Sequence, residues 1–153
     1  MPPRPKSGKK AAEEEAPPPL LAGKGEFAFE DGSTYTGEWK EAAPGGPRQR
    51  HGHGLWSLAD GKETYDGQWT QDIMQGLGKW SSATGDSYDG QWVDGMYHGY
   101  GTYNWADGCK YEGAWLAGRM HGEGTYYNAA GVAFPGQYIN GKLFNGQALL
   151  HVR

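Results

Sequence analysis

The stretch HGYGTYNWADGCKYEGAW, residues 98–115, decides the fold because glycines and aromatic side chains alternate along it with regular spacing. Successive side chains of a β-strand point to opposite faces. Tyr111, Gly113 and Trp115 therefore share one face of a predicted strand, and polar or small residues occupy the other. Asp107–Gly108, which precedes this strand, is a strong hairpin-turn signal. The stretch predicts a β-hairpin with one aromatic face.

The same pattern recurs along most of the chain. An aromatic-x-Gly-x-aromatic element begins at five positions, and the steps between them are 30, 23, 23 and 23 residues. These positions are Tyr35, Tyr65, Tyr88, Tyr111 and Phe134. Gly-x-Gly pairs, such as Gly99/Gly101, follow nearly the same period. A fixed period in the twenties is typical of stacked-repeat architectures.

The pairing register follows from the loop lengths. Three-residue loops in four of the units place rings opposite each other, as with Tyr103 and Tyr111. The second unit has one extra residue, which would turn every later side chain to the other face. A two-residue turn at Asp60–Gly61 is expected to absorb it and to keep Trp56 opposite Tyr65. The chain is therefore predicted to be all-β, an elongated single-layer twisted antiparallel sheet of tandem hairpins.

Each aromatic element carries a glycine in mid-strand, where glycine ordinarily costs about 0.5–1 kcal/mol relative to alanine. We expect a ring to lie across the bare backbone at each of these positions, as in the aromatic rescue of glycine. The glycines are Gly37, Gly67, Gly90, Gly113 and Gly136.

The pattern resembles the MORN repeat, whose signature is Y-x-G-x-W-x-x-G-x-x-H-G-x-G. The segments YDGQWVDGMYHGYG (88–101) and YEGAWLAGRMHGEG (111–124) follow this signature throughout. The last unit departs from it, with Asn145 where His is usual. Three parts are expected: a disordered N-terminal tail (1–21), an array of about five MORN repeats (22–148) with a Pro/Gly/Arg-rich insertion at 41–50, and a C-terminal end (149–153).

The resemblance implies a non-catalytic module. In a single-layer sheet the aromatic row has no second layer to cover it, and such a patch usually marks an interaction surface. We expect a scaffold or adaptor that holds a segment of a partner protein within a larger assembly. The predicted partner-binding residues are Tyr35, Trp39, Tyr65, Trp69, Tyr88, Trp92, Tyr111, Trp115, Phe134 and Tyr138.

The expected location is the cytoplasm and cytoskeleton. The single cysteine, Cys109, cannot form an internal disulfide, which fits a reducing compartment. The family includes ciliary radial-spoke proteins, so the resemblance suggests the axoneme of a cilium or flagellum.

The alternative is a peripheral membrane or phosphoinositide-binding module. From residue 20 onward the chain carries 10 basic and 15 acidic side chains. This balance disfavours anionic lipid and nucleic acid. A homodimer that buries the aromatic face is a third alternative.

No enzymatic activity, cofactor or metal ion is expected. The Gly-x-Gly pairs precede strand formers rather than the helix N-terminus that a phosphate-binding loop needs. His51, His98 and His121 lie one unit or more apart, which is too far for a metal cluster, so a structural role at turns is predicted. Cys109 has no catalytic partner at a fixed local spacing.

Overall fold

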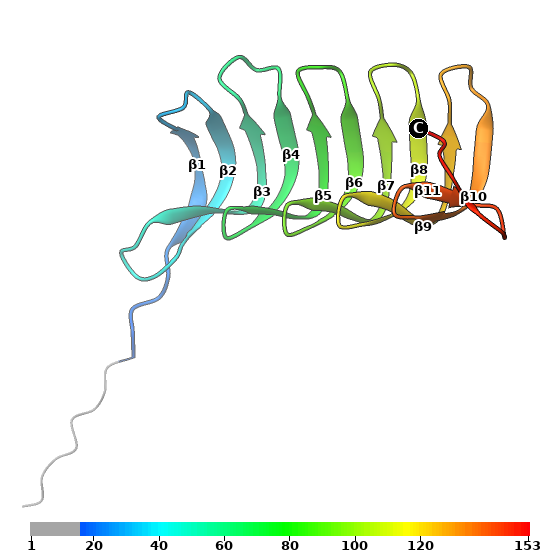
Figure 1. Ribbon diagram of the computed structural model, residues 1–153. Coiled ribbons are helices and arrows are strands. Elements are labelled where there is room, and N and C mark those ends of the chain that lie inside the picture. The colour runs from blue at the N-terminus through cyan, green and yellow to red at the C-terminus, as the bar shows by residue number, and fades with distance from the viewer. Residues whose placement is uncertain (1–15) are drawn as a thin grey trace, which may run out of the picture.

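The computed structural model describes residues 16–153, which form one open antiparallel sheet in which each strand pairs with the next in chain order (Figure 1). Its strands are β1 (Ala22–Ala28), β2 (Thr34–Glu41), β3 (Arg48–Ser57), β4 (Thr64–Thr70), β5 (Ile73–Ser81), β6 (Ser87–Val93), β7 (Met96–Asn104), β8 (Lys110–Leu116), β9 (Arg119–Tyr127), β10 (Ala133–Ile139), β11 (Lys142–Phe144) and β12 (Leu149–Leu150). This range contains no helix. The predicted fold class is confirmed. The disorder predicted for residues 1–15 lies outside the described residues.

Five hairpins, here called units one to five, are formed by β1–β2, β3–β4, β5–β6, β7–β8 and β9–β10. The predicted register is confirmed, because Tyr103 pairs with Tyr111 and Trp56 pairs with Tyr65. The predicted two-residue turn of unit two is wrong. The Gly61 N–H donates to the Leu58 carbonyl at 2.8 Å, which leaves a four-residue loop. Two-residue and four-residue loops have the same parity, so the aromatic face is preserved either way.

The insertion predicted at 41–50 lengthens the hairpin between β2 and β3. Glu41 pairs with Arg48 at the end of the two strands. The buried Glu41 carboxylate accepts hydrogen bonds from the backbone N–H groups of Leu21 (3.1 Å) and Gly45 (3.3 Å). One side chain thus fixes the loop of the insertion to the segment that leads into β1.

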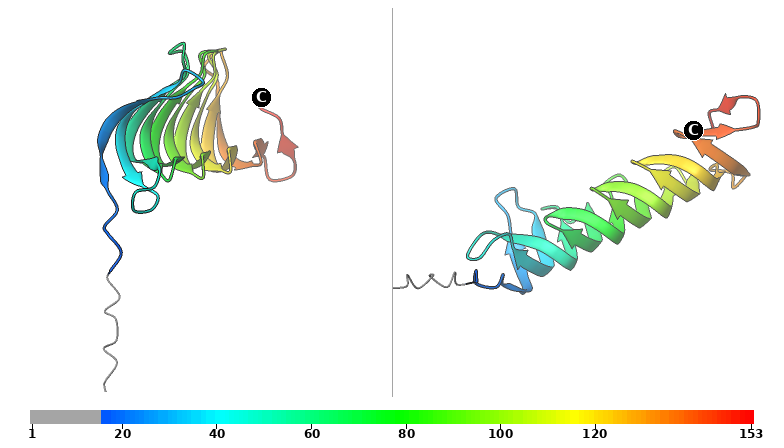
Figure 2. Two further views of the ribbon diagram at one scale, coloured as in Figure 1. Left: turned by 90° about the vertical axis from the view of Figure 1, so that its left-hand side faces the viewer. Right: turned by 90° about the horizontal axis from the view of Figure 1, so that it is seen from below.

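The single layer is bent into a trough, seen end-on in Figure 2. The bend coincides with bulges in the long strands, where the register shifts and one glycine has φ between +58° and +93°. These glycines are Gly52, Gly76, Gly99 and Gly122. A side chain of the facing strand closes the bulge: Gln91 Oε1 accepts the Tyr100 N–H at 2.9 Å, and Gln68 Oε1 accepts the Leu77 N–H at 2.7 Å. The glutamine of YDGQW therefore stabilises the bend.

A second set of glycines forms a stripe that crosses ten strands, each glycine paired with the next. It comprises Gly25, Gly37, Gly54, Gly67, Gly78, Gly90, Gly101, Gly113, Gly124 and Gly136. The Tyr88 ring lies over the bare backbone of Gly101, where an added Cβ would sit 2.5 Å from Tyr88 Cζ. The expectation that a ring of the neighbouring strand covers the mid-strand glycines is therefore met at their pairing partners and not at the predicted positions. A Cβ added at Gly90 would instead meet the Gly101 backbone and the Tyr88 hydroxyl, and one added at Gly136 would meet Leu143.

The core is a ladder of tyrosines and tryptophans in edge-to-face contact. Within unit three Tyr88 meets Trp92 at a centroid distance of 5.3 Å, and Tyr88 also meets Trp115 of the next unit at 5.6 Å. The ladder runs through Tyr35, Trp69, Tyr65, Trp92, Tyr88, Trp115, Tyr111 and Tyr138. Trp92 Nε1 also donates to the Gly78 carbonyl at 3.0 Å. The hydrogen bond therefore joins the two strands of one unit, and the edge-to-face contacts join each unit to the next.

From unit two onward, the turn that follows each unit contains two consecutive residues with positive φ, as type I′ turns require. At Ala117–Gly118, φ is 47° and 78°. The Gly118 N–H donates to the Tyr97 carbonyl of β7 at 2.9 Å, which fixes this turn to the first strand of unit four. Asn140–Gly141 is the equivalent turn one unit later, with the more suitable asparagine in the first position.

We expect Ala117→Asn to stabilise the protein by about 0.5–1 kcal/mol, because asparagine tolerates the left-handed conformation better than alanine does. The melting temperature should rise by about 1–4 °C. Ala130→Asn is the matched control, since Ala130 lies in a hairpin loop and has no positive φ. Thermal melts of both variants decide the matter. An unchanged or lower melting temperature for Ala117→Asn would contradict the strain assigned to this turn.

Candidate functional site

Most of the predicted partner-binding residues lie beneath the surface of the trough. Eight side chains are buried, with exposed fractions of at most 5%: Tyr35, Tyr65, Trp69, Tyr88, Trp92, Tyr111, Trp115 and Tyr138. Trp39 and Phe134, near the two ends of the array, are half-buried. The ladder covers each ring with its neighbours, so these eight rings form the floor of the trough. Contact with a partner stays a prediction, and it would have to come through the residues above the floor.

A second layer of half-buried apolar side chains lies on that floor. It is formed by Phe27, Trp56, Met74, Trp80, Tyr97 and Tyr103, all of which pack against the buried cluster. Trp56 was expected only as the pairing partner of Tyr65. Met74 and Tyr97 were missed. The repeat period could have identified them, because Met74, Tyr97 and Met120 occupy the same repeat position at 23-residue steps.

Over units one to four these side chains leave a groove. A hollow of about 550 Å³ is lined by Phe29, Trp56, Trp69, Met74 and Trp80, among other residues. A further hollow of about 270 Å³ shares Met74 and Trp80 and continues to Trp92 and Tyr97. We call these two hollows the open groove. Seven of the seventeen residues that line them are aromatic and two are methionines, the residue types enriched at the centres of protein interfaces.

The C-terminal end of the chain covers the trough beyond the open groove. After β12 the chain returns toward β8, as Figures 1 and 2 show. Val152 packs against the buried cluster. Arg153 Nη1 lies 2.7 Å from Asp107 Oδ2, and the guanidinium carbon lies 4.4 Å from the centroid of Trp105. An extended segment of the protein itself therefore occupies the same aromatic face.

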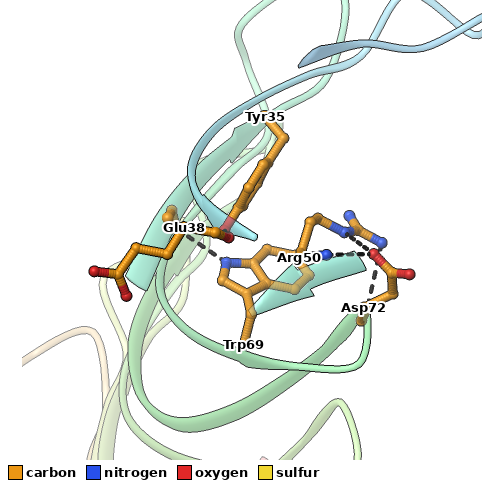
Figure 3. Close-up of polar contacts among 6 residues, drawn as sticks. Tyr35, Glu38, Arg50, Trp69 and Asp72 are labelled. Atoms are coloured by element: carbon orange, nitrogen blue, oxygen red, sulfur yellow. Dashed lines mark hydrogen bonds and ion pairs between the residues drawn. The ribbon is translucent and has the colours of Figure 1, made fainter. Parts of the chain in front are cut away.

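The open groove is rimmed by acidic groups. Asp31, Glu63 and Asp72 contribute to its lining, together with one cation, Arg50. Arg50 is engaged within the wall: its Nε lies 3.1 Å from Asp72 Oδ1, and its guanidinium carbon lies 4.3 Å from the Trp69 centroid (Figure 3). Hydrogen bonds from Ser33 lower the pKa of Asp31, so this carboxylate stays charged at neutral pH. The groove therefore favours positively charged groups.

A larger hollow of about 900 Å³ lies on the opposite, polar face over the glycine stripe. Glycines leave it without side chains at its base, and its walls include Thr102, Glu112 and Glu123. It offers no half-buried ring to hold a ligand. The open groove is therefore the better candidate site.

One of the three repeat-position histidines, His121, makes a side-chain contact at a turn. His121 Nδ1 accepts the backbone N–H of Asn140 at 3.4 Å, and Gln75 Oε1 accepts the equivalent N–H of Asp94 two repeats earlier at 3.0 Å. Residues 16–153 hold no group of three His, Cys, Asp or Glu side chains that could bind a metal ion. Within the same range, no helix is long and apolar enough to cross a membrane.

Comparison with protein families gives matches to a model described as the MORN repeat at four consecutive segments, residues 49–63, 65–87, 88–110 and 111–132. No curated protein matches the chain. The matched segments cover units two to four and the first strand of unit five. Unit one forms the same kind of hairpin in the structure although it lies outside the match.

Proposed function

The chain belongs to the MORN-repeat family, and from this premise we propose that it is a scaffold or adaptor that holds a segment of a partner protein in its open groove. MORN repeats are generally non-enzymatic modules that mediate interactions with proteins or membranes. The observation that carries the proposal is the uneven covering of the trough. One part of its aromatic face is covered by Val152 and Arg153, and the open groove is not.

The form of the groove supports a protein segment as its ligand. Its lining rings are already held by the ladder beneath them, so binding would cost little side-chain ordering. Its length spans several units, which suits an extended peptide rather than a compact small molecule. Val152 and Arg153 already place the side chains of such a segment on the aromatic face.

Charge weighs against the membrane alternative. Adsorption to anionic lipid needs clustered lysines and arginines. Around the open groove, Arg50 is neutralised by Asp72, and Asp31 and Glu63 add negative charge. We therefore favour a protein partner. Following the ciliary members of the family, we propose a cytoskeletal assembly such as a ciliary axoneme with radial spokes as the setting.

The test compares two charge-introducing variants. Met74→Glu places a carboxylate in the open groove, whereas Leu77→Glu places one on the opposite face, where Leu77 is 61% exposed. Proximity labelling with the full chain should recover a partner with wild type and Leu77→Glu. Recovery with Met74→Glu should fall about tenfold or more, because a buried unpaired charge opposes binding.

Melting temperatures of both variants establish that they are folded. Equal recovery by a folded Met74→Glu chain would overturn the proposal. Wild-type binding to phosphatidylcholine vesicles containing phosphoinositide, lost in Met74→Glu, would instead support the membrane alternative.

A further inference from the structure

Arg153 is held by an aromatic residue and a carboxylate at the loop of a hairpin, here called a corner, and the same pair of groups occurs at one other hairpin. In unit four this corner consists of Trp105, the last residue before the loop, and Asp107 within the loop. In unit one the equivalent residues are Phe29 and Asp31. The two loops have the same backbone bonds: the Trp105 N–H donates to the Cys109 carbonyl at 3.0 Å, and the Phe29 N–H donates to the Ser33 carbonyl at 2.9 Å.

The two carboxylates also occupy the same place. Asp107 Oδ1 accepts the N–H of Cys109 at 3.0 Å, and Asp31 Oδ1 accepts the N–H of Ser33 at 2.9 Å. Each carboxylate keeps its other oxygen, Oδ2, for a further partner. In unit four Asp107 Oδ2 takes the Arg153 guanidinium.

The remaining units lack this combination. Units three and five have Ser82 and Asn128 in place of the ring, and neither has a carboxylate at the following loop position. Unit two has Leu58 in place of the ring, and its loop is longer. A ring and a carboxylate therefore meet only at two corners of the five hairpins.

The corner of unit one is accessible. Phe29 is 44% exposed and lines the open groove together with Asp31. The Arg50 guanidinium carbon lies 5.8 Å from the Phe29 centroid, but its ion pair is with Asp72. Among residues 16–153 no basic side chain forms an ion pair with Asp31.

We propose that the Phe29–Asp31 corner and the adjoining open groove bind an extended protein segment that carries an arginine beside an aliphatic residue. The arginine stacks on Phe29 and pairs with Asp31, and the aliphatic side chain enters the hollow between Trp56 and Trp80. The contacts of Val152 and Arg153 provide the template, and stacking combined with an ion pair is a favourable arrangement for a guanidinium. This inference rests on the proposed function and specifies the partner's chemistry.

The probe is a labelled peptide with the sequence NGQALLHVR, residues 145–153, titrated into the full chain and followed by fluorescence anisotropy. Wild type should bind one peptide. Asp31→Asn should weaken binding about tenfold or more while its amide oxygen still accepts the Ser33 N–H, so the loop is retained. Asp60→Asn is the matched control, because Asp60 accepts the Lys62 N–H in the loop of unit two and lies outside the groove.

Arg153→Ala provides a second arm, because it frees the corner of unit four and should raise the stoichiometry to two. Binding to Arg153→Ala alone, or equal binding by Asp31→Asn and wild type, would overturn the inference.

Peptide binding that appears only after removal of residues 1–15 would also overturn it, because the basic N-terminal segment would then be the occupant of the corner. Concentration-dependent dimers lost in Asp31→Asn would assign the corner to a second copy and would also overturn it. A partner lost with Met74→Glu but not with Asp31→Asn would refute the arginine while leaving the proposed function intact.

Discussion

The Gly90→Ala variant is expected to lose about 3 kcal/mol or more of unfolding free energy, at the upper end of the range for overpacking. Gly90 has ordinary extended backbone, so the effect is steric. A Cβ there would sit 2.5 Å from Gly101 Cα and 2.7 Å from both the Tyr100 carbonyl oxygen and the Tyr88 hydroxyl. Two of these atoms belong to backbone that cannot move without separating β6 from β7. Thermal and urea melts followed by circular dichroism measure the loss.

Two further variants identify the cause. Gly90→Val should be worse than Gly90→Ala, although valine is the better strand former. Gly95→Asn should be nearly neutral, because nothing lies within 4 Å of a Cβ added there and asparagine tolerates its φ of 74°. If Gly90→Val melted at or above the wild-type temperature, close packing across the glycine stripe would be disproved.

Alkaline unfolding near pH 11 is the second large effect that we expect. Burial raises the pKa of eight tyrosines above the ordinary value of 10.0: Tyr35, Tyr65, Tyr88, Tyr97, Tyr103, Tyr111, Tyr126 and Tyr138. For Tyr35 and Tyr103 the pKa rises to about 12. Their contribution to stability is fully present below pH 10 and is lost as pH rises toward the folded-state values. Each such tyrosine lowers the unfolding free energy by about 1.4 kcal/mol per pH unit above 10.

The measurement is a pH titration that records phenolate absorbance at 295 nm together with far-ultraviolet circular dichroism. The two transitions should coincide, because the buried phenols ionise only when the sheet opens. Tyr97→Phe removes one of the ionising groups and should move the midpoint to higher pH, whereas the surface change Asp60→Asn should not. Ionisation of most tyrosines with the circular dichroism unchanged would show that these rings are not sealed from water.

The pairing register and the face that carries the aromatic ladder could be predicted, because both depend only on residue counts within each hairpin. The two-residue alternation and the fixed unit length place Tyr111 opposite Tyr103 whatever the sheet does beyond them. The bend could not be predicted, because Gly99 in a Gly-x-Gly pair reads equally well as an ordinary strand residue. Its positive φ becomes necessary only when Gln91 reaches across the bulge to the Tyr100 N–H.

The same bend explains what was missed at the candidate site. The pattern identified the aromatic face, but not that bending would bury Tyr88 and Trp92 and leave Met74 and Trp80 above them. The role of Arg153 was also hidden, since its partner Asp107 lies 46 residues earlier and neither residue belongs to the repeat signature. Contacts that join distant parts of the chain leave no periodic signal.

The strict pairing of each strand with the next has a mechanical consequence. The strands run across the long axis of the array, so the interstrand hydrogen bonds point along it (Figure 2). Tension applied between the two ends would load one ladder of bonds at a time, peeling strands away rather than shearing them past one another. Each unit of 23 residues would release about 70 Å of extended chain. Under load the array would lengthen in equal steps at low force, and any structure anchored at both of its ends would be shielded from sudden strain.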